Sequence, residues 1–180
     1  MADAATLSVH LAGEDDVPGF RAAARRLLAQ GVAPGRISWH VAGAVEADLF
    51  AKEEPAPDAP ATTGAVLKLP AFFVSLCNRT ALHADPARFG LLYRLAWRLL
   101  HEPGLRHDPL DPDRLQAEQM ARVVRRDMHK MTAFVRFRPL TAPTDDGWGV
   151  THVAWFEPGH HIVEATAPFF APPSHRQRRL

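Results

Sequence analysis

The sequence predicts an α+β fold, in which about five helices pack on a small mixed or antiparallel sheet. Two observations predict it. Segments 6–12 and 36–43 alternate apolar and polar residues as half-buried strands do, and later segments repeat apolar residues every three or four positions as helices do. Of the 180 residues, 47% are hydrophobic and 23% are charged, which is ordinary for one soluble globular domain. We expect a single domain over residues 1–170 and a disordered or truncated tail at 171–180.

The first 43 residues predict a β-α-β opening. A strand over 6–12 is followed by the acidic run Gly-Glu-Asp-Asp, which suits the start of a helix. The helix is expected over 18–30, with Gly31 as its stop, and the second strand over 36–43. If the two strands are parallel neighbours, the helix packs on one face of the sheet.

The middle of the chain predicts a loop, a short strand and two helices. Segment 51–64 is rich in proline, alanine and acidic residues without periodicity, so we expect a flexible surface loop. A short strand is expected over 65–70, and helices are expected over 71–82 and 86–102. Asp85 can cap the second of these helices, and Pro86 suits its first turn.

The next helix is expected from about Asp113 to Met131. Its apolar residues are four, three, four and three positions apart and so form one stripe, which consists of Ala117, Ala121, Val124, Met128 and Met131. At 100° per residue, the opposite side of the helix is cationic. It carries Arg122, Arg125, Arg126 and His129, with Lys130 at its edge.

The C-terminal part predicts a hairpin and a last helix. Segment 132–140 alternates as a strand, and 149–158 is expected to be its antiparallel partner across an Asp-Asp-Gly turn. A further helix can begin within 159–170 and is ended or interrupted by Pro168. Trp155 lies between Ala154 and Phe156 on the expected strand, and we expect its side chain in the core.

The charge of the chain is unevenly distributed. Segment 122–138 holds six lysines and arginines against one acidic residue, Asp127, so it carries +5, while the net charge of +1 leaves −4 for the remainder. Arg136 and Arg138 lie two residues apart on the expected strand and could extend the cationic side of the helix. Such a local patch is typical of proteins that bind an anion, with nucleic acid the commonest large one. The alternative is an ordinary solvated helix face.

Several classes of protein are disfavoured. The sequence contains no apolar run long enough to span a membrane and no secretory signal pattern. The one cysteine, Cys77, points to a reducing compartment, so we expect a cytoplasmic protein. Glycine-rich nucleotide-binding motifs, the phosphate-loop lysine motif and the nucleophile elbow are all missing from the sequence. We therefore expect no cofactor.

Two groups of residues could carry chemistry. His129 could act as a general acid or base, although Asp127 does not face it from two positions away on a helix. Glu157, His160 and His161, with Trp155 nearby, could line a pocket that the fold might share with His129. Three such groups could also ligate a metal, but their spacing does not match the usual helical ligand pattern, and we expect no metal.

Three segments carry a resemblance to a known family. Residues 85–102 (DPARFGLLYRLAWRLLHE), 123–139 (VVRRDMHKMTAFVRFRP) and 153–170 (VAWFEPGHHIVEATAPFF) resemble an uncharacterised bacterial domain described as a probable DNA-metabolism protein. That family is the N-terminal companion of UdgX-type uracil-DNA glycosylase domains, or is encoded beside a radical-SAM protein of suspected repair role. The resemblance spans about residues 7–170. The glycosylase half is absent from these residues, so its activity is not transferred to this chain.

The resemblance implies an accessory DNA-binding or docking domain in bacterial DNA repair. Its expected partners are DNA and a fused or neighbouring glycosylase-type or radical-SAM protein. The phosphate-contacting residues would be Arg122, Arg125, Arg126, His129, Lys130, Arg136 and Arg138. One alternative is a nucleic-acid-processing enzyme that uses His129 with Arg125, Arg126 and His160 or His161. The other is a protein-interaction module without DNA contact.

Overall fold

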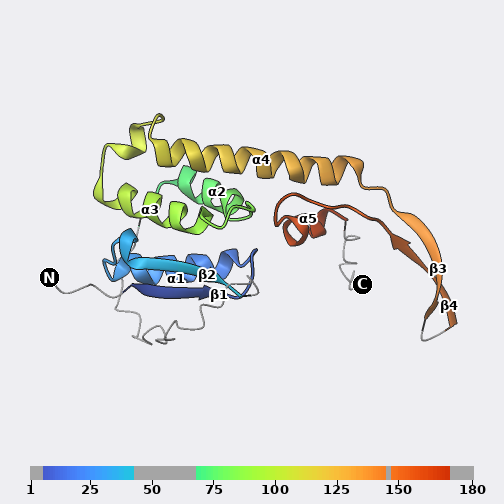
Figure 1. Cartoon of the computed structure of the whole chain (residues 1–180). Helices are drawn as coiled ribbons and strands as arrows, with labels where there is room; N and C mark the ends of the chain where they lie inside the picture. Colours follow the sequence, from blue (N-terminus) through green and yellow to red (C-terminus); the bar gives the residue numbers. More distant parts are fainter. Residues whose placement is uncertain (1–5, 43–67, 145–146, 171–180) are drawn as a thin grey trace, which may run out of the picture.

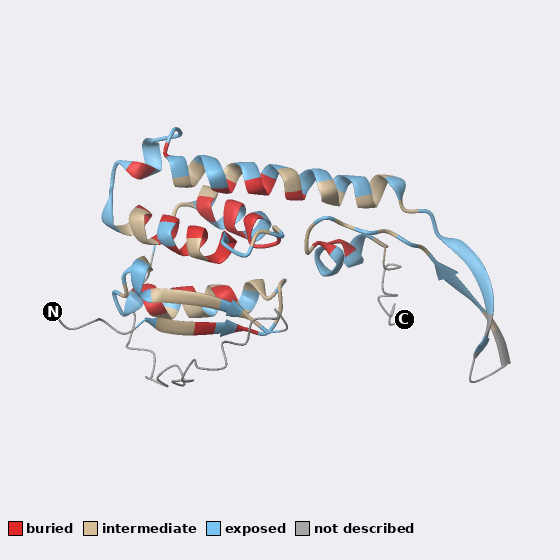
Figure 2. Ribbon diagram, in the orientation of Figure 1, coloured by how far each residue is buried: buried red, intermediate tan, exposed pale blue. Residues whose placement is uncertain are grey.

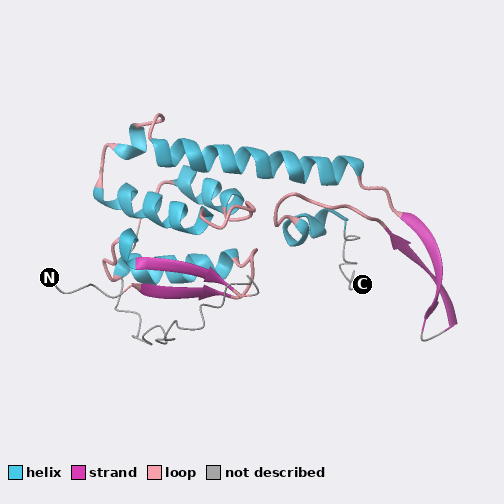
Figure 3. Cartoon of the chain, in the orientation of Figure 1, coloured by secondary structure: helices cyan, strands magenta, loops and turns pink. Residues whose placement is uncertain are grey.

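The computed structural model describes residues 6–42, 68–144 and 147–170. These residues form five α-helices and two separate two-stranded sheets (Figures 1 and 3). The predicted α+β class and the number of helices are confirmed. The strands form two sheets and not the one predicted: strands 7–11 and 37–41 pair with each other, and strands 138–144 and 147–153 pair with each other. The predicted loop at 51–64 and tail at 171–180 lie outside the described residues.

The chain opens with β1 (Leu7–Leu11), α1 (Val17–Ala29) and β2 (Ile37–Val41), and β1 and β2 pair in parallel. Asp16 caps α1, because its Oδ1 accepts a hydrogen bond of 2.8 Å from the amide of Gly19. Gly31 follows the helix in the left-handed conformation, with φ of 67°, which is the backbone that favours glycine there. The short 3-10 helix η1 (Pro34–Arg36) then leads into β2.

The two middle helices are α2 (Ala71–Thr80) and α3 (Arg88–His101). α3 begins two residues after Pro86. The side chain of Asp85 accepts a 2.8 Å hydrogen bond from the amide of Ala87, so it caps the turn before the helix. Of the predicted strand over 65–70, the first three residues lie outside the described part, and Lys68–Pro70 have no regular structure.

The longest helix is α4 (Pro112–Phe134), which follows the short 3-10 helix η2 (Leu105–His107). Asp111 caps it through a 3.0 Å hydrogen bond from the amide of Arg114. The predicted apolar stripe is confirmed, since its first three residues are buried and its last two pack against a buried cluster.

The body of the protein has three layers (Figures 1 and 2). The β1–β2 sheet with α1 forms one layer, α2 and α3 form the second, and the N-terminal half of α4 covers the second layer. Aromatic rings join the first two layers. Phe20 lies 4.9 Å from Trp39 and 5.0 Å from Phe89, and Trp39 lies 5.8 Å from Tyr93, measured between ring centroids.

A second, smaller cluster holds the C-terminal part against α4. Ile162 and Val124 are fully buried there and pack with Leu82. The cluster places α5 (Val163–Phe170) beside the C-terminal half of α4, and Pro168 lies inside α5 without ending it (Figure 1). The β3–β4 hairpin (Arg138–Thr144 and Gly147–Val153, antiparallel) projects beyond the end of α4.

Two sequence-based expectations about this part are wrong. Residues 132–134 belong to α4 and not to a strand, because the amide of Val135 still donates to the carbonyl of Met131 and Thr132 bonds back to Met128. Trp155 does not enter the core. It follows the end of β4 and is 87% exposed, because no further layer covers this segment in the described structure. None of the helices of the described chain has both the length and the apolar character needed to cross a bilayer.

Candidate functional site

The basic face consists of the exposed basic side chains on the C-terminal half of α4. They are Arg122, Arg125, Arg126, His129 and Lys130. Within residues 6–42, 68–144 and 147–170, no carboxylate pairs with any of them. Their charges are therefore available to an external anion.

The other half of α4 shows the opposite situation. Arg98 bonds to Asp111 at 2.7 Å and to Asp113 at 2.9 Å, and Arg94 bonds to Asp113 at 2.7 Å. Hydrogen bonds from Arg94 hold the pKa of Asp113 below its usual value. Arg114 pairs with Glu118 at 2.9 Å. The acidic groups of α4 therefore neutralise arginines near its N-terminus, and the basic face lies beyond them.

A shallow groove of about 210 Å³ extends the basic face onto α2. It is lined by Arg79 of α2 and by Arg122 and Arg125 of α4, above Leu76 and Ala121, with Glu118 at one side. Arg79 is exposed and is a residue that the sequence analysis missed. Only the packing of α2 against α4 brings it there, since the two helices are more than thirty residues apart in the sequence.

The two arginines after α4 are exposed, but they do not share a strand face as expected. Arg138 is the first residue of β3. Arg136 lies before the strand, and its Nη1 donates to the carbonyls of Ala133 and Val135 at 2.8 and 3.0 Å. It therefore binds the last carbonyls of α4, as cations at helix C-termini do.

Two residues of the predicted pocket, His160 and His161, lie beside His83. We call these three residues the histidine cluster. His83 lies in the loop between α2 and α3, and its ring centroid is 4.5 Å from that of His160. His160 Nδ1 accepts from the amide of Ala84 at 3.1 Å, and the amide of His161 donates to the carbonyl of Leu82 at 2.9 Å. The segment Glu-Pro-Gly-His-His is thus docked on the α2–α3 loop.

Asp127 of α4 holds this segment from the other side. Its Oδ2 accepts a 3.1 Å hydrogen bond from the amide of His160. His129 is two residues further along, about 200° around the helix, and is exposed. No hydrogen bond or ring contact in the described structure joins it to His160 or His161. The C-terminal half of α4 therefore contacts the Glu-Pro-Gly-His-His segment through Asp127 and not through His129.

A buried arginine lies beneath the histidine cluster. Arg88 has no exposed surface, and its guanidinium donates to the carbonyls of Ala81, Asp85 and Glu14 at 2.9, 3.1 and 2.6 Å. It also pairs with the carboxylate of Glu14, which lies 3.6 Å from Nε2 of His161. Arg88 thereby joins the β1–α1 loop to the α2–α3 loop, and Glu14 in turn meets His161 of the C-terminal segment.

Two residues of the predicted pocket form no hydrogen bond, ion pair or ring contact with this cluster in the described structure. Trp155 and Glu157 are exposed, while His160 and His161 are partly buried. His83, Glu14 and Arg88 take part instead, and no local pattern indicated them. In the part of the chain that the structure describes, no group of three or more His, Cys, Asp or Glu side chains is arranged to hold a metal ion.

A comparison with family models matches residues 86–178, just over half of the chain, to a domain of unknown function, DUF4130. The chain belongs to the DUF4130 family. The matched DUF4130 region contains α3, α4, the hairpin and α5, and therefore the basic face, Asp127, His160 and His161. Arg79, His83 and Glu14 lie before it. Since the DUF4130 description states no function, the link to UdgX-type proteins and DNA metabolism stays a prediction.

Two further comparisons gave no result. The DUF4130 chain matches no curated protein and no solved structure significantly.

The histidine cluster of this DUF4130 protein makes its stability sensitive to acid. Burial lowers the pKa of His83, helped by the neighbouring His160, and burial with the charge of Arg88 lowers the pKa of His161. The unfolded chain then binds protons more readily than the folded chain. Stability is full above the unfolded histidine pKa of about 6.5 and falls as the pH drops through the folded values. Urea unfolding between about pH 7.5 and pH 5 measures this, above the range in which carboxylates titrate.

A matched variant separates this effect from general acid sensitivity. His83 Nδ1 accepts a 3.0 Å hydrogen bond from the amide of Asp85, and the Oδ1 of an asparagine could accept the same bond without titrating. We expect His83→Asn to reduce the slope of stability against pH between about pH 6.5 and 5, and the remaining slope to come from His161. An unchanged slope in that variant would assign the effect to other groups.

Proposed function

We propose that this chain is an accessory DNA-binding domain of bacterial DNA repair, which holds the phosphate backbone on the basic face. The observation that carries the proposal is the set of exposed arginines and lysine on α4 that no described carboxylate pairs with. By contrast, Arg94 and Arg98 of α3 and Arg114 of α4 are all paired with carboxylates near the start of α4. Exposed guanidinium groups can form two parallel hydrogen bonds to phosphate oxygens. Each phosphate that is neutralised releases counterions from the DNA, which favours binding at low salt.

The spacing of these side chains suits a nucleic-acid strand. Arg122 and Lys130 are eight residues apart, so the basic face extends roughly 12 Å along α4. That length corresponds to about three or four phosphates of one strand. Arg79 widens the face across the groove between α2 and α4. A surface of this kind positions DNA without reading its bases.

The test is the salt dependence of DNA binding. Fluorescence anisotropy with a labelled duplex of about 20 base pairs, at about 50 to 300 mM KCl, is expected to give a slope of log K against log salt near −3. The double variant Arg122→Ala, Arg125→Ala is expected to have a slope smaller in magnitude by about two. We also expect it to bind DNA at least tenfold more weakly at low salt.

A charge-matched control comes from η1 and η2. Arg36 and Arg106 are exposed on these short helices, away from the basic face. The variant Arg36→Ala with Arg106→Ala loses the same net charge, and we expect it to keep most of the affinity. An equal loss of DNA affinity in both double variants would show that binding depends on net charge and not on the basic face. No affinity for DNA at low salt would refute the proposal and leave a protein-docking role.

The chemistry of repair would come from a partner in this proposal. The resemblance to the companion domain of UdgX-type glycosylases supports a fused or neighbouring glycosylase-type or radical-SAM protein as that partner. The enzyme alternative has a separate test. If His129→Ala kept DNA affinity but abolished a product formed by the parent protein, catalysis at His129 would replace the accessory role.

A further inference from the structure

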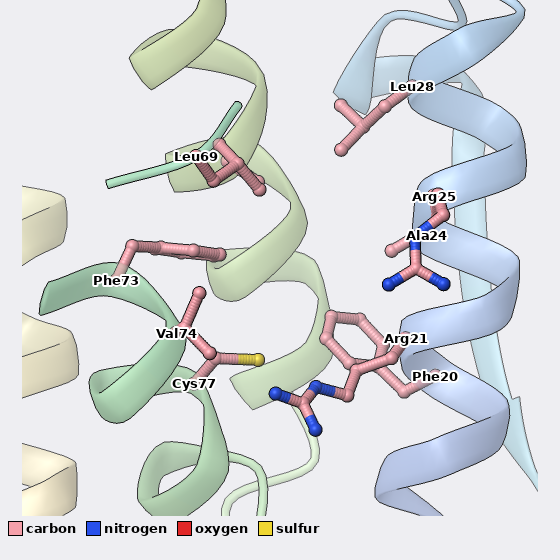
Figure 4. A pocket seen from close by; sticks show the side chains of 10 residues that line it. Phe20, Arg21, Ala24, Arg25, Leu28, Leu69, Phe73, Val74 and Cys77 are labelled. Atoms are coloured by element: carbon pink, nitrogen blue, oxygen red, sulfur yellow. The ribbon is translucent and has the colours of Figure 1, made fainter. Parts of the chain in front are cut away.

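A second cationic site lies on the other side of α2, in a cleft between α1, α2 and α3 (Figure 4). The cleft has a volume of about 200 Å³. Its walls include Phe20 and Ala24 of α1 and Phe73 and Cys77 of α2, and each of these side chains is at least nine-tenths buried. The cleft is therefore lined mainly by apolar side chains that the three helices supply.

Two guanidinium groups stand at this apolar cleft. Arg21 and Arg25 lie one turn apart on α1 and both line the cleft; Arg21 reaches from α1 toward α2, and the guanidinium of Arg25 stays beside α1 (Figure 4). Neither forms an ion pair with any acidic side chain in the described ranges. Burial raises the pKa of the Cys77 thiol to about 11, so this sulfur is neutral near pH 7 and does not neutralise the arginines. The cleft thus combines an apolar interior with two uncompensated positive charges.

We infer that this cleft binds a small carboxylic acid with an apolar chain, of the medium-chain fatty-acid class. A carboxylate between Arg21 and Arg25 would receive charge-assisted, bidentate hydrogen bonds. The chain would lie against Phe73 and Cys77, in a volume that holds roughly seven water-sized groups. Octanoate has seven CH₂ and CH₃ groups beyond its carboxylate and is the expected best fit.

The composition of the cleft favours this ligand over a nucleotide. A nucleobase needs acceptors and donors for its polar edge, whereas the lining residues from the described part of the chain include no carboxylate, amide or hydroxyl side chain. The volume is also below the roughly 300–1,000 Å³ of sites for larger ligands. The site is independent of the basic face, since α2 separates the cleft from the groove lined by Arg79.

Isothermal titration calorimetry of the full chain with a series of straight-chain acids tests the inference. We expect the Kd to tighten about fourfold for each methylene added up to octanoate, and to stop tightening beyond it. Octan-1-ol has the same chain without the charge and is expected to bind at least tenfold more weakly. NOEs from the terminal methyl of octanoate to Phe73 and Cys77 would locate the chain in the cleft.

Three variants connect binding to the cleft. Arg21→Gln with Arg25→Gln is expected to weaken octanoate binding at least tenfold, whereas Arg26→Gln, on the same helix but outside the cleft lining, is expected to leave it unchanged. Val74 is half-exposed at the edge of the cleft, and Val74→Phe should block the chain without disturbing the core.

Several results would overturn the inference. They are no octanoate binding at millimolar concentration, equal binding of octanol, or tighter binding of a deoxynucleotide or inorganic phosphate than of octanoate. The test is also separate from that of DNA binding. Arg122→Ala with Arg125→Ala should keep full octanoate affinity, so either proposal can fail without the other.

Discussion

Replacing Arg88 by methionine is expected to lower the free energy of unfolding by about 3–5 kcal/mol. Methionine keeps much of the volume but removes every donor of the guanidinium. The carbonyls of Ala81, Asp85 and Glu14 would then lose their hydrogen bonds inside the fold, where water does not replace them freely. For a chain of this size we expect the midpoint of thermal unfolding to fall by roughly 10 °C, measurable by calorimetry.

The variant Glu14→Gln tests whether the carbonyl network or the ion pair is responsible. The Glu14 side chain is 40% exposed, and a glutamine oxygen could still accept from Arg88. We expect this change to cost less than about 2 kcal/mol, because Arg88 keeps its carbonyl hydrogen bonds and a hydrogen bond to the glutamine oxygen. If it destabilised the protein as much as Arg88→Met, the charge pair and not the network of carbonyls would be the main stabilising contact.

Replacing Ile162 by alanine is expected to release the C-terminal segment from α4. Ile162 is fully buried, and the cluster it forms with Val124 and Leu82 is separate from the main core. The lost contacts and the cavity should cost about 2–4 kcal/mol. Because the cost is confined to this cluster, amide exchange in α5 should accelerate roughly 30-fold or more while α3 stays protected. Hydrogen exchange followed by mass spectrometry measures both.

The neighbouring residue provides the matched control for this experiment. Val163 is 52% exposed, and Val163→Ala should change stability by no more than about 0.5 kcal/mol. Faster exchange throughout α1–α3 in Ile162→Ala would contradict the separate cluster, because it would show that the C-terminal segment and the main core unfold together.

The elements that could be predicted are those whose pattern is local. The spacing of Ala117, Val124 and Met128 predicted both the course of α4 and its buried side, because one stripe must face whatever covers the helix. Alternation predicted β1 and β2 in the same way. The end of α4 could not be predicted, since 132–140 suits a strand equally well and the helix continues through local hydrogen bonds at Thr132.

The exposure of Trp155 shows a second limit. Its apolar neighbours on an expected strand indicate burial only if another layer packs on that strand, and the described structure contains none there. The same limit applies to Arg136. A strand pattern placed it beside Arg138, whereas the carbonyls at the end of α4 bind it.

The sequence by itself determined the α+β class, the two strands and the helix at the start of the chain, the apolar stripe of α4 and the position of its basic face, because each depends on periodicity within one segment. That the two strands pair in parallel was decided by the tertiary structure. Only the tertiary structure decided what each face meets. Arg79 joins the basic face through the packing of α2 on α4, and Arg88 meets Glu14 across 74 residues. His160 meets Ala84 across 76 residues. Periodicity specifies that a face is buried or exposed, but such hydrogen bonds form only after the layers have packed.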